Sequence, residues 1–245
     1  MIDSAPLPVA TDAVPVRDRF RIRFAKTGLL RWIGHHDLQR LWERLLRRNG
    51  LPLAISTGFH PRPRMSFASA LALGIEGLDE VVEIELTQSI SADALRSVIE
   101  ADNQPGLAVG DVTLIATNGG NGGGSAISPG LKKARHHSSD YEIEIPDEYD
   151  LARVDEAITY LRSLATISIQ RKEKTVSVSA PQIFPWIERR ERWLCVKQIE
   201  IEAASLKITD LLDAMGLSDL LPAGAIIRRT RLYLTDQLTS AALND

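Results

Sequence analysis

The chain has 245 residues, a net charge of −3 and one cysteine. The single Cys195 excludes an internal disulfide, a CxxC metal site and an iron–sulfur cluster held by this chain alone. No stretch approaches the roughly 20 apolar residues of a membrane span, and residues 1–18 lack the basic start and apolar core of a signal peptide. We therefore expect a cytoplasmic protein with no membrane partner, whose first 18 residues form a disordered leader.

Positive charge is concentrated near the N-terminus. Residues 17–64 contain twelve Lys and Arg against three Asp and Glu, a balance of 12 − 3 = +9, so the other residues hold 17 − 29 = −12. A basic segment in an otherwise acidic protein is typical of a surface that binds a polyanion, because the acidic remainder keeps the protein soluble. The charge pattern therefore favours nucleic acid as a partner.

The first half of the chain alternates between strand and helix patterns. Apolar residues that alternate with arginines predict a strand over 20–24, and an apolar stripe predicts a helix over Asp37–Asn49 with Asp37 as its N-cap. The next expected elements are extended segments at 53–56 and 64–70, a strand at 81–86, a helix from Ser91 to about residue 100 and a strand at 107–115. The order β-α-β-β-α-β is characteristic of a ferredoxin-like sandwich.

A glycine-rich segment separates the two halves. The stretch NGGNGGGSAISPG at 118–130 cannot pack and predicts a flexible linker. The second half repeats the order more loosely, with strands expected at 141–145, 167–171, 175–180, 194–202 and 225–234 and helices at 151–164 and 208–215. We therefore predict an α+β protein with two ferredoxin-like domains in tandem, at 19–117 and 139–236, joined by a linker at 118–138 and followed by a tail at 237–245.

The motif GHHD stands just before the first expected helix. Gly34 permits close approach of the backbone, and a helix N-terminus offers N–H groups that suit a phosphate. His35 and His36 lie beside this position, and Lys26 ends the preceding strand. An imidazole there could act as a general acid or base, as in metal-independent RNA cleavage. The alternative is that one histidine caps or packs and the other is solvated.

The motif STGFHPRPR at 56–64 is both stiff and basic. Its two prolines fix φ and hold their neighbours extended, so His60 and Arg62 should be displayed rather than folded away. Arg62 and Arg64 suit a phosphate backbone, and Phe59 or His60 could stack on a base. The alternative is a rigid structural turn whose arginines are only solvated.

The first expected helix carries arginines on its outer face. They could contact phosphates or form an ordinary solvated face, and the residues are Arg40, Arg44, Arg47 and Arg48. Smaller basic groups occur at 171–174, 189–192 and 228–231. No pattern indicates a metal site or a cofactor, because adjacent histidines project in different directions.

The stretch from KTGLLRWIGHHDL to GFHPRPRMSF resembles a bacterial family of unknown function, the radical-SAM-linked proteins, over about residues 19–116. Members occur alone or as the C-terminal part of cobalamin-binding radical SAM proteins, and their usual strings are close to SHLDL and GFNPHPRxSF. Here His35 matches the family histidine, His36 replaces a Leu, His60 replaces an Asn and Arg62 replaces a His. The resemblance implies an accessory role in which RNA is presented to a radical SAM partner enzyme.

Three functions follow as hypotheses. The first is a module that binds tRNA or rRNA, with contacts from Lys26, Arg31, His36, Arg40, Arg44, Arg47, Arg48, Phe59, His60, Arg62 and Arg64. The second is a metal-independent ribonuclease in which His35 is the catalytic acid or base and Arg62 or Lys26 stabilises the phosphorane. The paired fold with a histidine at its first helix is similar to CRISPR repeat-processing endoribonucleases. The third is a protein–protein adaptor with a basic docking face. The nucleic-acid hypotheses require the two motifs to converge in one cleft.

Overall fold

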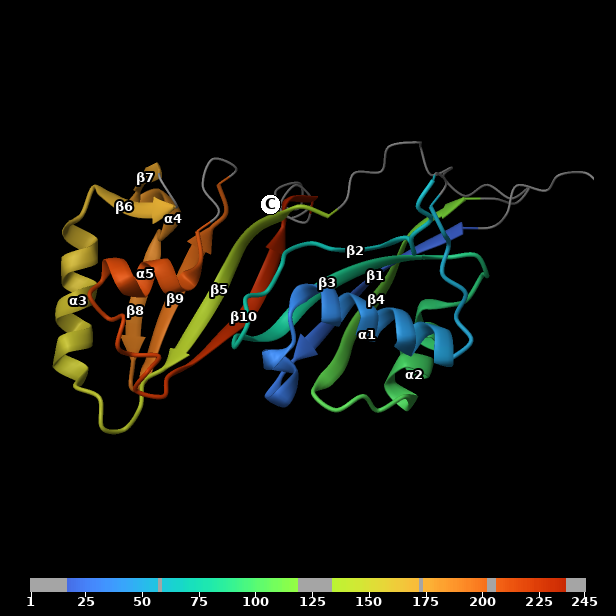
Figure 1. Ribbon diagram of the computed structural model, residues 1–245, viewed down its shortest axis with the longest axis horizontal. Coiled ribbons are helices and arrows are strands. Elements are labelled where there is room, and N and C mark those ends of the chain that lie inside the picture. Colours follow the sequence, from blue (N-terminus) through green and yellow to red (C-terminus); the bar gives the residue numbers. More distant parts are fainter. Residues whose placement is uncertain (1–16, 57–58, 119–133, 172–173, 202–205, 237–245) are drawn as a thin grey trace, which may run out of the picture.

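The computed structural model describes residues 17–56, 59–118, 134–171, 174–201 and 206–236. One mixed sheet runs the length of this part of the molecule, in the order β4-β1-β3-β10-β5-β9-β8, with the short β2 beside β3 (Figure 1). Helices α1 and α2 lie at the end formed by the first half of the chain, and α3, α4 and α5 lie at the other end. The protein is therefore a mixed α+β structure, as expected.

The first half of the chain supplies four strands and two α-helices. In chain order they are β1 (Arg17–Lys26), a 3-10 turn η1 (Gly28–Trp32), α1 (His35–Arg48), β2 (Met65–Phe67), β3 (Glu76–Leu86), α2 (Ala92–Ala101) and β4 (Leu107–Asn118). The strands β4, β1, β3 and β2 lie in that order and are antiparallel. The expected helix at Ser91 is confirmed, because the Ser91 side chain accepts a hydrogen bond from the Ala94 amide.

The second half supplies the remaining elements. They are β5 (His136–Glu144), α3 (Leu151–Ser163), β6 (Thr166–Arg171), β7 (Lys174–Ser179), α4 (Ala180–Ile183), β8 (Trp186–Arg190), β9 (Trp193–Ile199), α5 (Ile208–Ala214) and β10 (Ile226–Leu234). The strands β10, β5, β9 and β8 lie in that order and are antiparallel, while β6 and β7 form a separate hairpin. The sequence analysis missed β8 and the one-turn α4, because only a few residues separate them from their neighbours.

A short parallel pairing joins the two halves. Arg228 pairs with Glu76 and Arg229 with Gly77, which places β10 beside the start of β3. Two sandwiches with separate sheets were expected, whereas the strands of both halves share one sheet. The linker expected at 118–138 is shorter in the structure, because Asn118 ends β4 and His136 begins β5, and residues 119–133 lie outside the described residues.

Helix α1 forms because its apolar residues recur at helical spacing and cover the sheet. Its apolar stripe is fully buried as expected, and consists of Leu38, Leu41, Trp42, Leu45 and Leu46. The Trp42 ring packs edge-on against Phe24 of β1, with 5.1 Å between ring centroids. The expected N-cap was wrong: Gly34 occupies the N-cap, and Asp37 lies inside the first turn, where its charge faces the positive end of the helix dipole.

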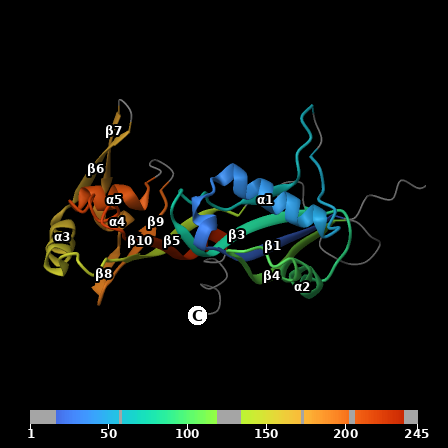
Figure 2. The ribbon, with the colours of Figure 1, turned by 60° about the horizontal axis from the view of Figure 1, so that its bottom comes forward.

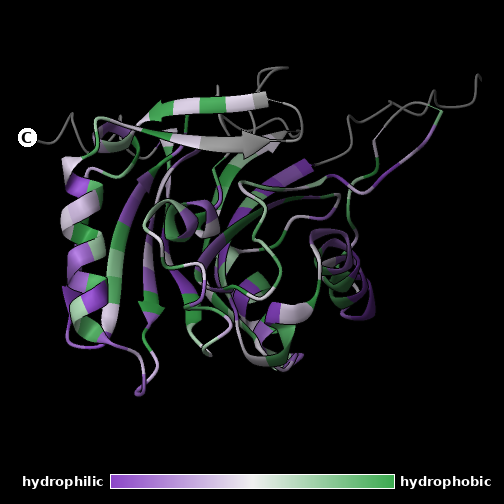
Figure 3. Cartoon of the chain, turned by 60° about the vertical axis from the view of Figure 1, so that its left-hand side comes forward, coloured by the Kyte–Doolittle hydropathy of each residue, from purple (hydrophilic) through white to green (hydrophobic). Residues whose placement is uncertain are grey.

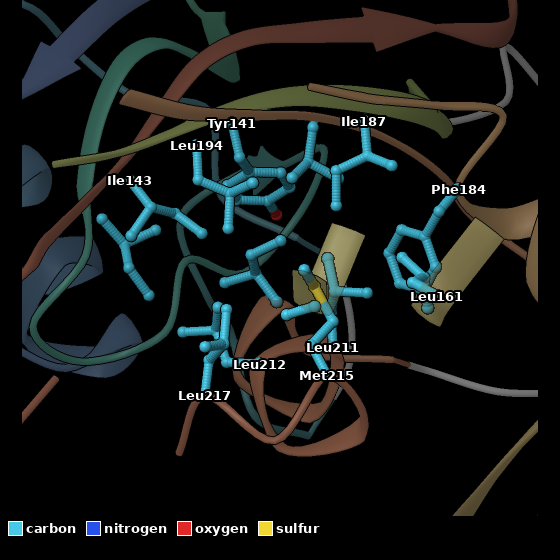
Figure 4. Close-up of a cluster of buried hydrophobic side chains, with 14 of the residues drawn as sticks. Tyr141, Ile143, Leu161, Phe184, Ile187, Leu194, Leu211, Leu212, Met215 and Leu217 are labelled. Atoms are coloured by element: carbon cyan, nitrogen blue, oxygen red, sulfur yellow. The ribbon is translucent and has the colours of Figure 1, made fainter. Parts of the chain in front are cut away.

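The second half has its own apolar core. One apolar face of α3 and one of α5 are buried in a cluster with residues of β5, β8, β9 and β10, and Figure 3 shows hydrophobic residues of α3 on the side toward the sheet. Figure 4 shows this cluster closely, including Tyr141 with its hydroxyl directed among the buried side chains. Cys195 is a buried residue of β9, as predicted, and burial raises the pKa of its thiol. None of the helices described is long and apolar enough to cross a membrane.

Candidate nucleic-acid interface

The basic residues of 17–64 do not form one surface. Three arginines of β1 lie on the sheet face opposite α1 and pair with acids of other segments. Arg19 and Arg21 share Glu83, with Nη2 atoms 2.6 and 2.8 Å from its carboxylate oxygens, and the Glu83 side chain is only 2% exposed. Arg23 pairs with Asp79. This part of the +9 balance is therefore used to hold strands together.

Lys26 is also withdrawn from solvent. It ends β1 as expected, but it is only 1% exposed and its Nζ donates to the Ile33 carbonyl at 3.0 Å. Burial lowers the pKa of its ammonium group, and the nearby Glu80 opposes this effect. The predicted RNA contact by Lys26 was wrong, because a buried ammonium with a protein acceptor cannot reach a phosphate.

The second motif stands on a hairpin that leaves the body of the protein. The Ser56 amide donates to the Arg62 carbonyl at 2.8 Å, and the Arg64 amide donates to the Ala54 carbonyl at 2.7 Å. The Ala54 amide in turn donates to Glu85 of β3, which fixes the hairpin base to the sheet. We call residues 54–64 the basic hairpin, although residues 57–58 lie outside the described residues. It projects beside the C-terminal end of α1 (Figures 1 and 2).

The tip of the basic hairpin exposes an aromatic ring and two basic groups. Phe59 has an exposed fraction of 102%, and His60 and Arg62 are also exposed. Arg64, nearer the base, is partly covered and pairs with Glu85 at 3.1 Å. The two prolines predicted that His60 and Arg62 are displayed at the surface, and both side chains are exposed on the hairpin.

The outer arginines of α1 are exposed but mostly paired. Arg40 contacts Asp37, Arg47 contacts Glu43 at 2.6 Å and Arg48 pairs with Asp102 of the segment after α2. The exposed pairs of Arg40 and Arg47 contribute little to stability and exchange readily for another anion, whereas the Asp102 side chain that binds Arg48 is only 5% exposed. Among the described residues Arg44 has no ion-pair partner, so its charge is available on the helix face.

The basic hairpin and α1 meet in a shallow groove. A cavity of about 330 Å³ separates them, lined by Glu43, Arg47, Gly50, Leu51, Pro52, Leu53, Ile55 and Pro63. The C-terminal half of α1 and the hairpin base therefore form opposite walls of one groove. Arg47 lines this groove, Arg44 lies about one turn earlier on α1, and Arg62 precedes the lining residue Pro63 on the basic hairpin.

His35 lies at the far end of the helix. It opens α1, whereas Arg47 beside the hairpin is twelve residues later, which is about 18 Å along the axis. The expectation that both motifs converge in one cleft was wrong. From the basic hairpin the chain runs through β2 back along α1, so the residue that contacts His35 is Phe67 at the end of β2 and not a residue of the hairpin. The Phe67 and His35 rings are 5.3 Å apart, edge to face.

The environment of His35 favours packing over catalysis. Gln39 Nε2 donates to His35 Nε2 at 3.2 Å, and His36 is exposed with its Nδ1 3.3 Å from Gln39 Oε1. Burial, followed by the charges of His36 and Lys26, lowers the pKa of His35, so its imidazole is neutral at pH 7. The ribonuclease hypothesis needed Arg62 or Lys26 beside His35, and the first is remote while the second is enclosed.

Arg31 is held within the protein surface. Its guanidinium lies 5.0 Å from the centre of the Trp32 ring, and Nη1 is 3.9 Å from Glu76. Arg31 therefore belongs to the turn η1, and it is not among the residues that line the groove.

The sequence did not predict the pairing of Arg48 with Asp102, because nothing in it indicates that the end of α2 meets the end of α1.

Comparisons with known proteins place the chain in a family without a described activity. The model of a family described as an uncharacterised protein conserved in bacteria (DUF2344) matches residues 19–213. No curated protein matches. Among solved structures, one match is the crystal structure of an unknown protein from Galdieria sulphuraria, with 10% identity, 89% of this chain and 99% of that chain covered, and a TM-score of 0.24. Among the described residues, no group of three or more His, Cys, Asp or Glu could hold a metal ion.

Proposed function

The chain belongs to this uncharacterised bacterial family (DUF2344), and we propose, from the surface described above, that it is an RNA-binding accessory module. Its binding surface is the groove between the C-terminal half of α1 and the basic hairpin. Single-stranded or looped segments of tRNA or rRNA fit this surface, because their unstacked bases can reach a projecting aromatic ring.

The observation that carries the proposal is the exposure of Phe59 at the tip of a stiff, basic hairpin. A phenylalanine side chain that is 102% exposed gains nothing from the fold and leaves apolar area in water. Stacking on an RNA base covers that area, and a base–aromatic stack contributes about 1–3 kcal/mol. His60 beside it offers a second ring with hydrogen-bonding nitrogens.

The arginines around the groove complement that ring. Arg44 and Arg62 lack ion-pair partners among the described residues, and the exposed pairs of Arg40 and Arg47 can open at small cost. Guanidinium groups bind phosphate oxygens in a two-pronged geometry, which suits a nucleic-acid backbone. Phosphate contacts give affinity, while Phe59 and His60 distinguish unpaired bases from a duplex.

Two finer points belong to the same proposal. The strand orders β4-β1-β3-β2 and β10-β5-β9-β8 correspond position by position, which supports two ferredoxin-like units that share one sheet. The sequence resemblance to radical-SAM-linked proteins supports a radical SAM enzyme as the partner that acts on the bound RNA. In this role the protein binds and presents RNA and performs no chemistry.

Titration of labelled bulk tRNA with the whole protein tests the proposal. Released counterions drive such binding, so about four phosphate contacts predict a roughly hundredfold loss of affinity between about 50 and about 200 mM salt. Phe59→Ala and Arg62→Gln should each weaken binding roughly tenfold. Arg96→Gln and Arg153→Gln, on exposed faces of α2 and α3, are matched controls that should bind as the parent does.

Absence of binding at the lower salt concentration would contradict the proposal. Binding that the four variants weaken equally would show that the groove is not the site. If RNA does not bind and a protein partner is retained after nuclease treatment, the basic face is a docking surface for an acidic protein.

A further inference from the structure

A second cavity lies away from the basic hairpin, where the two halves of the sheet join. Its volume is about 560 Å³. The loop between β2 and β3 forms one wall, and the ends of β5 and β9 with the start of α5 form the others. It is lined by Ala68, Ser69, Ala70, Leu71, Ala72, Ile75, Ala134, Arg135, His136, Tyr141, Gln198, Glu200, Leu206, Lys207, Ile208 and Arg229.

A buried ion pair stands in the wall of this cavity. Arg229 of β10 is 2% exposed and Glu80 of β3 is 3% exposed, and the guanidinium binds both carboxylate oxygens of Glu80. The third guanidinium nitrogen, Nη1, donates to Ser69 Oγ in the cavity loop at 3.1 Å. Glycine is required at position 77, because a Cβ there would lie 2.5 Å from the Glu80 side chain. The absence of a side chain at residue 77 thus leaves space for the Glu80 carboxylate between the two apolar cores.

Cationic side chains and one acid line the cavity. Arg229 is paired with Glu80, Lys207 carries a second positive charge, and Glu200 is the acid in the lining. His136 reports this environment: burial first and then the charge of Arg229 lower its pKa to about 4, so its ring is neutral at pH 7. Lys207, which begins the turn into α5, is exposed at the cavity edge.

The loop wall offers backbone donors. Residues 69–72 read Ser-Ala-Leu-Ala, and none of their four N–H groups donates a hydrogen bond to a described residue. Small side chains at three of these four positions let a ligand approach the backbone closely. Consecutive free amides beside a cation are suited to an oxyanion, which accepts several short hydrogen bonds.

One part of the lining is apolar. Leu71, Ile75, Leu206 and Ile208 are each at most 8% exposed and belong to the core of the second half. Gln198 lies among them, fixed by a hydrogen bond from its Nε2 to the Leu206 carbonyl at 2.8 Å. The volume falls within the range of about 300–1,000 Å³ that is usual for small-molecule sites. The cavity can therefore hold a ligand that has a charged end and an apolar body.

We propose that this cavity binds a small molecule that carries a phosphate or carboxylate group on an apolar or planar body of about nucleotide size. The oxyanion lies between Lys207 and the amides of residues 69–72, and the body lies against Leu71 and Ile208. The site is independent of the proposed RNA groove, with which it shares no lining residue. Its ligand is a freely diffusing compound rather than a segment of the bound RNA.

Titrations of the whole protein, followed by amide NMR shifts and by the unfolding temperature, test this proposal. Adenosine 5′-monophosphate is compared with adenosine, and hexanoate with hexanol, so that each acid has a neutral partner and the two pairs distinguish phosphate from carboxylate. At least one acid should bind saturably, with shifts at residues 69–72 and 207, and should bind roughly tenfold more tightly than its neutral partner.

Variants locate the binding. Ala70→Phe places a ring in the cavity from an exposed position, and Lys207→Gln removes the charge at its edge. Each should weaken the acid roughly tenfold or more and leave tRNA binding unchanged. Leu73→Phe, on the same loop but outside the cavity, and Arg44→Gln, on the exposed face of α1, should leave the binding of the acid unaffected. If neither acid binds, or if both bind no better than their neutral partners, the proposal is wrong. Binding that survives Ala70→Phe overturns it as well.

Discussion

Strand β1 and helix α1 carry arginines from the same basic segment, and the fold uses them in opposite ways. Arg19 and Arg21 lie on the sheet, 2.6 and 2.8 Å from the buried carboxylate of Glu83. Arg44 and Arg47 stand on an exposed helix face, where Arg47 pairs with Glu43 one turn away. One set stabilises the protein, and the other is available to a partner.

The difference follows from the geometry of the two elements. A strand in the middle of a sheet has neighbours on both sides, so Arg19 of β1 lies directly opposite Glu85 of β3, and Arg21 lies opposite Glu83. A helix that covers a sheet has one buried stripe, and the residues between its apolar positions face water. Charge density in the sequence therefore overstates the surface that can bind a polyanion. Of the basic residues at 17–64, only those on α1 and the basic hairpin remain as a candidate surface for a polyanion.

The largest expected effect separates these two sets by stability. Glu83→Gln leaves Arg19 and Arg21 without their shared counter-charge and should lower the free energy of unfolding by about 3–5 kcal/mol. Glu43→Gln makes the same change opposite Arg47 and should cost less than about 1 kcal/mol, because that pair is exposed. Urea unfolding of the two variants and the parent measures both values. Equal losses would contradict the distinction between the two arginine sets.

The pH dependence of stability tests the environment of a second kind of basic residue, the histidine His136. His136 of β5 is buried with a folded pKa of about 4, while the unfolded chain has the ordinary value near 6.5, so the unfolded state binds more protons between these values. Stability should therefore fall as the pH drops from about 6.5 to about 4, by up to about 3 kcal/mol. His136→Gln should reduce this loss. A pH profile that His136→Gln leaves unchanged would refute the assignment.

The sequence was sufficient for most elements and for the exposed tip of the basic hairpin. The stripe of α1, the cap at Ser91 and the display of His60 and Arg62 are local properties, set by spacing, capping and proline geometry within a few residues. The burial of Lys26 and the pairing of β10 with β3 depend on contacts between residues far apart in the chain. Periodicity carries no information about such contacts, so the convergence of GHHD with the hairpin could not be tested without the fold.

A smaller effect is expected on RNA affinity, where an exposed arginine of α1 is compared with the buried lysine of β1. Arg44→Gln should weaken tRNA binding roughly tenfold with little change in stability, because its charge faces water. Lys26→Met should leave RNA affinity unchanged, since that ammonium is only 1% exposed and bound to the Ile33 carbonyl. Anisotropy titrations of correctly folded variants give both results. A larger loss of affinity from Lys26→Met than from Arg44→Gln would reverse the assignment of the two residues.

The central claim is that RNA lies in the groove between α1 and the basic hairpin. Ultraviolet crosslinking of bound tRNA to the whole protein, followed by tryptic digestion and mass spectrometry, tests it most directly. The account predicts that crosslinks concentrate in the peptide 49–64, which contains Phe59 and His60 and is not cleaved before its prolines. Crosslinks confined to the second half of the chain, or to peptides of β1, would contradict it.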